Sequence, residues 1–292
     1  MKDKKIHFIV NPISGKGLGK KVKNRIEELF ADYDKEIKVT RKKDDGYKFA
    51  LQSIKEGADI IVSCGGDGTL NEVATALLNK EIPLAIVPIG SGNGLARHLH
   101  IPLTYEEALQ SLKTSQHTSK KIDCGKINNI YFFSNAGIGF DAHTVKEYAH
   151  QKKRQLAGYV KSAIVSVFKY KPIQIDMHSE TKNFKGKAMM LNISNSNCLG
   201  YGFSISPKAS LQDGKFDVNL ITECSWGAFG LIGMGYLLNT NFGSKKKIFF
   251  KSNQLEIEFD GKYLQIDGEY IPTNAKKLTV SLLPQSLKVL IA

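Results

Sequence analysis

The first 120 residues alternate between short apolar runs and segments whose apolar residues recur at helical spacing. The apolar runs predict strands at residues 6–10, 36–40, 59–63 and 84–87. The segments between them predict helices over about 20–30, 45–55 and 69–78. Strands that alternate with helix-length segments indicate βαβ units, so this part of the chain is expected to form an open, mostly parallel sheet.

The pattern changes near residue 122. Beyond it lie many short runs rich in β-branched and aromatic residues, with turn signals such as Asp213-Gly214 and Asp267-Gly268 between some of them. This pattern predicts a mainly antiparallel β-sandwich, with helical insertions at about 144–170 and 226–238. We therefore expect an α/β domain over residues 1–122, completed by the C-terminal segment 284–292, and a β domain over residues 123–283.

Composition narrows the class of protein. The chain has 292 residues, 42% hydrophobic and 24% charged, which excludes a disordered chain and an integral membrane protein. Lys and Arg number 41 against 28 Asp and Glu, a net charge of +13 spread along the chain. Such a surface attracts nucleotides, phospholipid head groups or nucleic acid. No nucleic-acid-binding motif is present, so nucleic acid is not an expected partner.

Cysteine usage and the start of the chain indicate the compartment. The four cysteines are widely spaced, which argues against a zinc site and a disulfide framework. The first residues show no signal-peptide pattern. We therefore expect a protein of the reducing cytoplasm.

Three glycine-rich turns follow three of the predicted strands. They are Asn11–Gly17, Cys64–Thr69 and Gly90–Gly94. Glycines let backbone N–H groups approach a polyphosphate, and a following helix N-terminus adds partial positive charge. Any one of them is also what an ordinary βα connection looks like. Three at the same sheet edge favour a phosphate site, because open α/β sheets bind ligands at the carboxyl ends of their strands.

Asp67 stands between glycines just ahead of a predicted helix. One interpretation is a helix cap. The other is a carboxylate that holds Mg²⁺ beside a phosphate site, since bare anions repel each other.

Five motifs, in order along nearly the whole chain, resemble the diacylglycerol kinase catalytic superfamily, which includes bacterial lipid kinases and the sphingosine and ceramide kinases. The strongest is Gly65-Gly66-Asp67-Gly68-Thr69-Leu70-Asn71-Glu72. The others are Asn11-Pro12-Ile13-Ser14-Gly15, the Gly90–Ala96 segment, Asp213-Gly214 and Asp267-Gly268-Glu269.

The resemblance implies a nucleotide-binding N-terminal domain, a C-terminal β-sandwich domain that holds lipid and metal, and an active site in the cleft between them. It implies ATP contacts from residues of the first loop, the second strand's end, the second loop and the third loop: Asn11, Pro12, Ile13, Ser14, Gly15, Thr40, Gly65, Gly66, Asp67, Gly68, Thr69, Leu70, Asn71 and Ser91. It implies Glu269 as the general base. It also implies a structural Mg²⁺ held by the Asp213 carboxylate and mainly by backbone oxygens of Ser210 and Lys215.

The third loop departs from the pattern of many bacterial diacylglycerol kinases. Gly94 stands where those enzymes have Asp, and the form of the loop is closer to sphingosine and ceramide kinases. The hypothesis is therefore an ATP- and Mg²⁺-dependent lipid kinase with a diacylglycerol or a sphingoid or ceramide-like acceptor, in which Glu269 is the base and Asp67 organises Mg²⁺. The alternatives are an NAD-kinase-like enzyme and a non-catalytic nucleotide-binding regulator.

A basic segment at residues 146–171 interleaves charged and apolar side chains. Its cations are Lys146, Lys152, Lys153, Arg154, Lys161, Lys169 and Lys171. Two interpretations stay open: a solvated helix face, or a surface that faces anionic lipid. The lipid-kinase hypothesis adds a peripheral location at the inner face of the membrane, and a homodimer is compatible with it.

Overall fold

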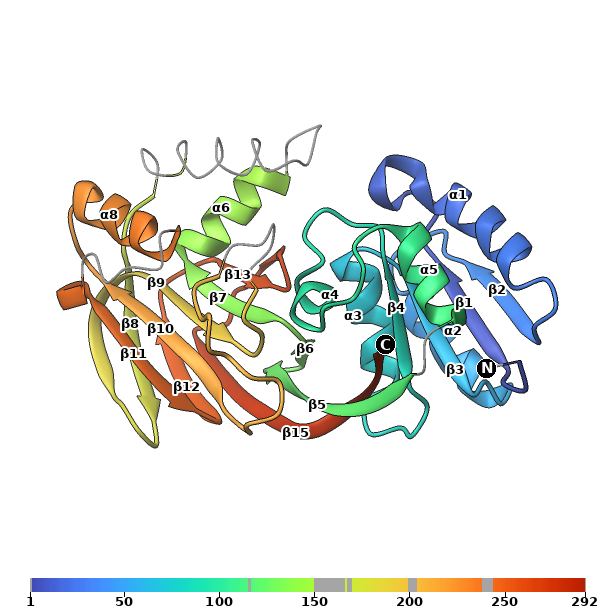
Figure 1. The fold of residues 1–292 in the computed structure, drawn as a ribbon. Helices are drawn as coiled ribbons and strands as arrows, with labels where there is room; N and C mark the ends of the chain where they lie inside the picture. Colours follow the sequence, from blue (N-terminus) through green and yellow to red (C-terminus); the bar gives the residue numbers. More distant parts are fainter. Residues whose placement is uncertain are drawn as a thin grey trace. The chain divides into compact units, whose positions relative to one another are not determined.

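The computed structural model describes residues 2–114, 117–149, 166, 170–198, 204–237 and 244–291 (Figure 1). The chain divides into two compact units. The first comprises residues 1–123 and 284–292, and the second comprises residues 124–283. Two long strands, β5 (Thr118–Ile127) and β15 (Lys277–Ile291), contain the points where the chain passes from one unit to the other.

The first unit contains a parallel sheet in the order β15-β4-β3-β1-β2. Its strands are β1 (Ile6–Val10), β2 (Lys35–Val39), β3 (Ile60–Gly65), β4 (Leu84–Pro88) and the end of β15. Strands β1, β3 and β4 are buried along their whole length, as expected for parallel strands that are covered on both faces. The predicted α/β architecture is confirmed.

Four helices cover the two faces of this sheet: α1 (Ser14–Leu29), α2 (Asp45–Lys55), α3 (Asp67–Ala76) and α5 (Tyr105–Thr114). The short helix α4 (Gly94–His98) follows the third glycine loop. Helices α1 and α5 contact each other, and so do α2 and α3. Val22 and Ile26 of α1 pack with Leu109 of α5 on Phe8 and Val10. Because side chains alternate along a strand, His7 and Ile9 of β1 face the opposite layer.

The second unit is built from antiparallel strands: β6 (Ile130–Phe132), β7 (Asn135–Gly139), β8 (Ile173–Ser179), β9 (Phe184–Ser194), β10 (Phe216–Thr222), β11 (Lys247–Ser252), β12 (Gln254–Phe259), β13 (Tyr263–Ile266) and β14 (Glu269–Pro272), with parts of β5 and β15. The main order is β14-β13-β7-β9-β8-β12-β15, and β10 joins β9 to β11. One apolar core contains side chains from strands throughout the unit, including Phe132, Ile175, Leu191 and Phe216. The predicted β-sandwich class is confirmed.

Two helices of the second unit lie at the predicted insertions. Helix α6 (Phe140–Ala149) begins four residues before the expected segment, and the short 3₁₀ helix η1 (Ser244–Lys246) precedes β11. Helix α8 (Trp226–Leu237) occupies the predicted apolar stretch. The basic segment 146–171 lies largely outside the described residues, which leaves both of its interpretations as predictions. Among the described helices, none combines the length and apolar character that a membrane crossing requires.

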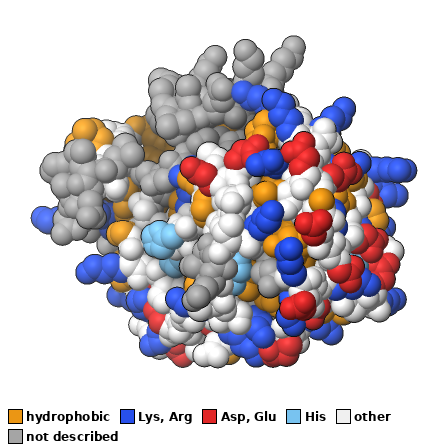
Figure 2. Space-filling view, turned by 45° about the vertical axis from the view of Figure 1, so that its right-hand side comes forward, with side chains coloured by type: hydrophobic (Ala, Val, Ile, Leu, Met, Phe, Trp, Pro, Cys, Tyr) orange, Lys and Arg blue, Asp and Glu red, His pale blue; other side chains and the backbone are white. Residues whose placement is uncertain are grey.

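Charged side chains of both signs are interspersed on the face shown in Figure 2. Several charged side chains of the first unit form ion pairs, such as Arg25 with Glu28 at 3.1 Å and with Glu106 at 2.9 Å. Because these pairs are exposed to solvent, they contribute little to stability and leave the net positive charge unchanged.

Candidate functional site: the glycine loops and the Asp-Gly-Glu hairpin

The strands of the first unit end together, and the three glycine loops leave from that common edge. Val10 pairs with Val39 of β2 and with Cys64 of β3, and Gly65 pairs with Pro88 of β4. Thr40 follows β2 at the same edge, is buried, and donates its backbone N–H to the Val10 carbonyl at 3.0 Å. The expectation that these segments share one sheet edge is confirmed.

The second and third loops touch through glycines. A Cβ at Gly90 would lie 2.6 Å from the Gly66 Cα and 2.8 Å from the Asn93 Oδ1. Asn93 adopts a left-handed conformation with φ 52° and donates its side-chain amide to the Gly90 carbonyl at 2.9 Å. The backbones of these two loops therefore approach each other so closely that a side chain at Gly90 would separate them.

Asp67 connects these two loops. The helix α3 starts at Asp67 with Gly66 as its N-cap, two residues earlier than predicted. The Asp67 Oδ2 accepts the backbone N–H of Asn93 at 2.8 Å, and Oδ1 accepts that of Gly94 at 2.9 Å. The carboxylate thus satisfies N–H groups at the start of α4. Asp67 therefore does act as a cap, but for α4, whereas the sequence indicated the helix α3 that follows it directly.

The first loop is held against the second. The Asn11 side-chain amide donates to the Thr69 Oγ1 at 2.9 Å, and its Oδ1 accepts the Ile13 N–H at 3.2 Å. A Cβ at Gly15 would collide with the Ile89 carbonyl, which follows β4. Gly15, Lys16 and Gly17 all have positive φ, which is why a tight turn precedes the regular part of α1.

The structure therefore brings most of the expected ATP-contact residues to one place. Asn11 is hydrogen-bonded to Thr69, and Asp67 joins the second loop to the third. Gly15 lies against the residue that follows β4. The others lie in the same three loops or in the first turns of α1 and α3: Pro12, Ile13, Ser14, Gly65, Gly66, Gly68, Leu70, Asn71 and Ser91. Ile13 is 81% exposed, and Leu70 is buried.

Glu72 is a positioning residue that the sequence interpretation did not assign. Its Oε1 accepts the Asp44 N–H and its Oε2 accepts the Gly46 N–H, both at 2.9 Å, at the start of α2. A Cβ at Gly46 would lie 2.7 Å from that Oε2. The signal was present, because Glu72 follows Asp67 within the same glycine-rich motif. Its partners lie 26 and 28 residues away, which no local pattern shows.

Glu269 begins β14, directly after a two-residue hairpin turn. Asp267 and Gly268 both have positive φ (48° and 83°), the conformation that an Asp-Gly hairpin turn requires. Glu269 is exposed. A carboxylate at this place is carried by a rigid turn and is accessible to a substrate.

Asp267 anchors that turn, a role that was not predicted. Its carboxylate accepts the backbone N–H groups of Phe133 (3.0 Å), Ser134 (2.7 Å) and Asn135 (3.1 Å). Its own N–H donates to the Asn135 carbonyl at 2.9 Å. Because three consecutive N–H groups converge on one carboxylate, the position of Glu269 depends on the β6–β7 connection.

The turn expected to hold a structural Mg²⁺ contains a different cation. Asp213 accepts the Lys215 N–H on Oδ1 at 3.2 Å and the Lys251 ammonium on Oδ2 at 2.6 Å. The Ser210 hydroxyl oxygen accepts the Gln212 N–H at 3.2 Å. The Asp213 carboxylate is thus already paired with a positive charge, which would repel a second cation. As arranged, these residues do not fit an additional divalent ion.

Asp141 is a buried carboxyl group of the second unit. Asp141, in the first turn of α6, is 4% exposed, and burial raises its pKa to about 6. A Cβ at Gly137 would lie 2.9 Å from the Asp141 Oδ2, so the small residue makes room for this carboxyl. The sequence interpretation did not select Asp141.

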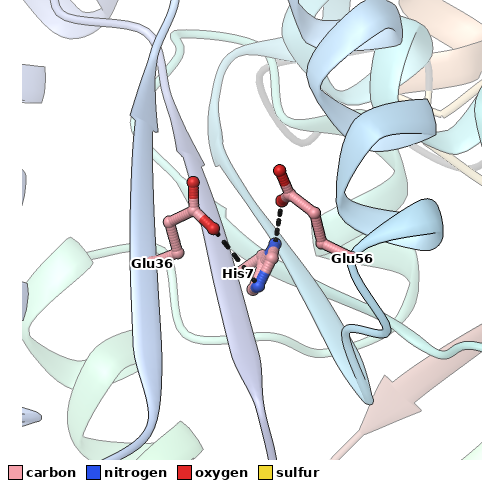
Figure 3. A group of neighbouring side chains, drawn as sticks. All are labelled: His7, Glu36 and Glu56. Carbon is pink, nitrogen blue, oxygen red and sulfur yellow. Dashed lines mark ion pairs between the residues drawn. The ribbon is translucent and has the colours of Figure 1, made fainter.

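A separate cluster of titratable groups lies near the amino ends of the strands of the first unit (Figure 3). The buried His7 ring lies between Glu36 and Glu56, with N···O distances of 3.6 Å to each. These three residues are spaced closely enough for a metal ion. However, the Lys38 ammonium, 2.7 Å from a Glu56 oxygen, already pairs with both carboxylates. Burial lowers the pKa of His7, and hydrogen bonding from Lys38 lowers the pKa of Glu56 to about 2.

Comparisons with known proteins agree with this architecture. The chain is 28% identical to a diacylglycerol kinase of Bacillus subtilis over 276 residues, which is 91% of this chain and 90% of that protein. It is also 28% identical to a diacylglycerol kinase of Staphylococcus aureus over 282 residues, covering 93% and 89%. A crystal structure of a diacylglycerol kinase from Bacillus anthracis superposes with a TM-score of 0.76 at 23% identity, over 99% and 97% of the two chains.

A more distant structural neighbour is an NAD kinase from Archaeoglobus fulgidus in complex with ATP. Its TM-score is 0.53 at 12% identity, over 97% and 92% of the two chains, which shows a shared fold. Residues 5–127 match the diacylglycerol kinase catalytic domain, and residues 134–291 match the YegS C-terminal NAD kinase β-sandwich-like domain. The chain belongs to the diacylglycerol kinase family that combines these two domains.

Proposed function

We propose that this protein is a lipid kinase that transfers the γ-phosphoryl group of ATP to a hydroxyl group of a lipid. The observation that carries the proposal is that three glycine loops are joined at one sheet edge. Asp67 and the Gly66–Gly90 contact join the second loop to the third, and the Asn11–Thr69 hydrogen bond joins the first loop to the second. Backbone N–H groups in such loops suit a polyphosphate. The family membership identifies phosphoryl transfer as the chemistry that this arrangement serves.

Asp67 suits both a positioning role and a role toward Mg²⁺. Glu72 is the other carboxylate of its motif, and it is bound to the start of α2. Because position 94 is glycine, the third loop has no carboxylate, and Asp67 is the carboxylate residue of the three loops that could bind the Mg²⁺ of Mg-ATP. When bound, that ion would neutralise charge on the phosphate oxygens during transfer. Asp67 would orient the loops around it through Asn93 and Gly94.

Glu269 is the residue that we assign as the general base. A lipid hydroxyl is a weak nucleophile, and a positioned carboxylate that takes its proton contributes typically about 10²–10⁴-fold to the rate. The exposed Glu269 side chain on a turn that Asp267 anchors meets the need for access and for a defined position. The proton passes from the hydroxyl oxygen to a Glu269 oxygen as the new O–P bond forms, while the bond between the γ-phosphorus and the bridging oxygen breaks and ADP leaves with that oxygen.

The acceptor class follows from the family and from the relatives, which are called diacylglycerol kinases. We propose a lipid of the diacylglycerol class, or a sphingoid or ceramide-like lipid, presented at the surface of a membrane to which the protein binds peripherally. We include in this proposal that the basic segment 146–171 faces the membrane and that the protein can form a homodimer.

The deciding experiment measures transfer from γ-labelled Mg-ATP to diacylglycerol, monoacylglycerol, ceramide and sphingoid bases in mixed micelles, with NAD as a separate acceptor. We expect a labelled lipid, and the Glu269→Gln variant should lose it. Glu258→Gln serves as the matched control, because Glu258 is another exposed glutamate on a strand of the same unit. Transfer to NAD and to no lipid would establish the NAD-kinase-like alternative instead.

A further inference from the structure

Two aspartates and one lysine of the second unit form a compact charged cluster at the start of the β10–β11 pair. The Lys251 ammonium lies 2.6 Å from the Asp213 Oδ2 and 2.9 Å from the Asp217 Oδ1. The contact with Asp213 is a charge-assisted hydrogen bond, and the contact with Asp217 is an ion pair. One ammonium thus provides the positive charge for two carboxylates, as a bound metal ion could also do.

The backbone builds this cluster. Asp217 and Lys251 are directly paired across the antiparallel strands β10 and β11. Gly214 has φ +68°, and its turn lets the Asp213 carboxylate accept the Lys215 N–H while facing Lys251. The Lys251 carbonyl accepts the Thr181 hydroxyl at 3.0 Å, which fixes the strand that carries the ammonium.

Burial makes the cation necessary. Asp217 is 1% exposed, whereas Asp213 and Lys251 are each about one-third exposed. A buried carboxylate without a counter-charge is strongly unfavourable. Burial raises the pKa of Asp217. Burial also opposes the charged form of Lys251, but the pKa of Lys251 is raised, because its ammonium donates to Asp213 and is paired with Asp217.

We propose that Lys251 is a built-in cation that takes the place of a structural divalent ion at the Asp213–Asp217 carboxylate pair. Mg²⁺ binds oxygen ligands at about 2.0–2.1 Å and dehydrates reluctantly. At Asp213 it would meet an ammonium already on the same oxygen. The second unit of this chain therefore folds without a divalent ion at this turn, and removing Lys251 turns the carboxylate pair into a metal site.

The test compares melting temperatures in EDTA and in Mg²⁺, without nucleotide, for the wild type and for Asp213→Asn, Lys251→Met and the double variant. For each protein we measure the rise in melting temperature that Mg²⁺ causes. Only the part of that rise that is lost when Asp213→Asn is added counts as binding at this site. We expect none in the wild type. In Lys251→Met we expect a melting temperature lower by about 6 °C or more in EDTA, and a recovery of about 5 °C at a Mg²⁺ concentration 100 times its Kd.

A matched control is Lys185→Met. Lys185 pairs with Asp176 at the same 2.6 Å distance, but Asp176 is 24% exposed and the pair lies on the surface. This variant should change neither the melting temperature in EDTA nor the Mg²⁺ response.

If Mg²⁺ raised the melting temperature of the wild type but not that of Asp213→Asn, the proposal would be overturned. This comparison does not depend on the stability of the Lys251→Met variant. A Lys251→Met protein that folds and shows no Asp213-dependent response would overturn the claim that the pair can hold a metal. Because the readout is the melting temperature, the result is independent of whether the protein phosphorylates lipid.

Discussion

The contact between the second and third glycine loops can be tested with a single methyl group. In the Gly90→Ala variant, the new Cβ would lie 2.6 Å from the Gly66 Cα, whereas carbon atoms in favourable contact are about 3.5–4.0 Å apart. The loops must therefore separate by roughly 1 Å. The two hydrogen bonds from Asn93 and Gly94 to Asp67, at 2.8 and 2.9 Å, span the same gap and would lengthen with it.

The expected effect is a loss of both stability and nucleotide affinity. Overpacking of this kind costs about 1–3 kcal/mol, and a hydrogen bond to a charged group contributes about 1.5–3 kcal/mol. At about 2–4 °C per kcal/mol, the melting temperature should fall by several degrees. The KM for ATP should rise, because the N–H groups of the two loops no longer converge.

Thermal unfolding and the ATP dependence of lipid phosphorylation measure these effects. Gly230→Ala is the matched control: Gly230 lies inside α8, and a Cβ there would meet nothing within 4 Å. It should raise stability by about 0.5–1 kcal/mol and leave the KM unchanged. A Gly90→Ala protein with the wild-type melting temperature and KM would refute the close-contact argument.

Three further predictions address other parts of the molecule. Glu269→Gln should lower kcat by about 10²–10⁴-fold at an unchanged melting temperature; wild-type turnover would exclude Glu269 as the base. Asp267→Asn should lower the free energy of unfolding by at least about 1.5 kcal/mol in denaturant titrations, because an amide NH₂ would face the N–H donors of the β6–β7 connection; unchanged stability would contradict the anchoring role. Burial holds the pKa of His7 below 6.5, so the unfolded chain takes up the proton first and stability should decrease as the pH falls below 6.5. His7→Gln should show a shallower decrease between pH 6.5 and 5.5, and an equal slope would remove His7 as its cause.

The sequence predicted the two kinds of architecture because hydrophobic periodicity is a local property. The helix at Asp45–Lys55 was recognisable from the helical spacing of its apolar residues. The strand at Ile6–Val10 and the helix at Trp226–Leu237 were recognisable as continuous apolar runs. The strand β7 (Asn135–Gly139) was not, because Asn and Gly disfavour strands. It is a strand because β9 and β13 pair with it on either side.

The glycine loops and the Asp-Gly-Glu turn were also evident from the sequence, since glycine patterns and turn chemistry depend on neighbouring residues. The partners of their carboxylates were not. Asp67 binds N–H groups 26 and 27 residues away, Asp267 binds those about 133 residues away, and Asp213 meets an ammonium 38 residues away. The sequence shows that a carboxylate next to glycine is available as a hydrogen-bond acceptor. Which hydrogen-bond donor reaches that carboxylate is decided by the packing of the strands and loops. The amino acids thus determined which groups this protein can use, while the tertiary structure decided what each of them holds.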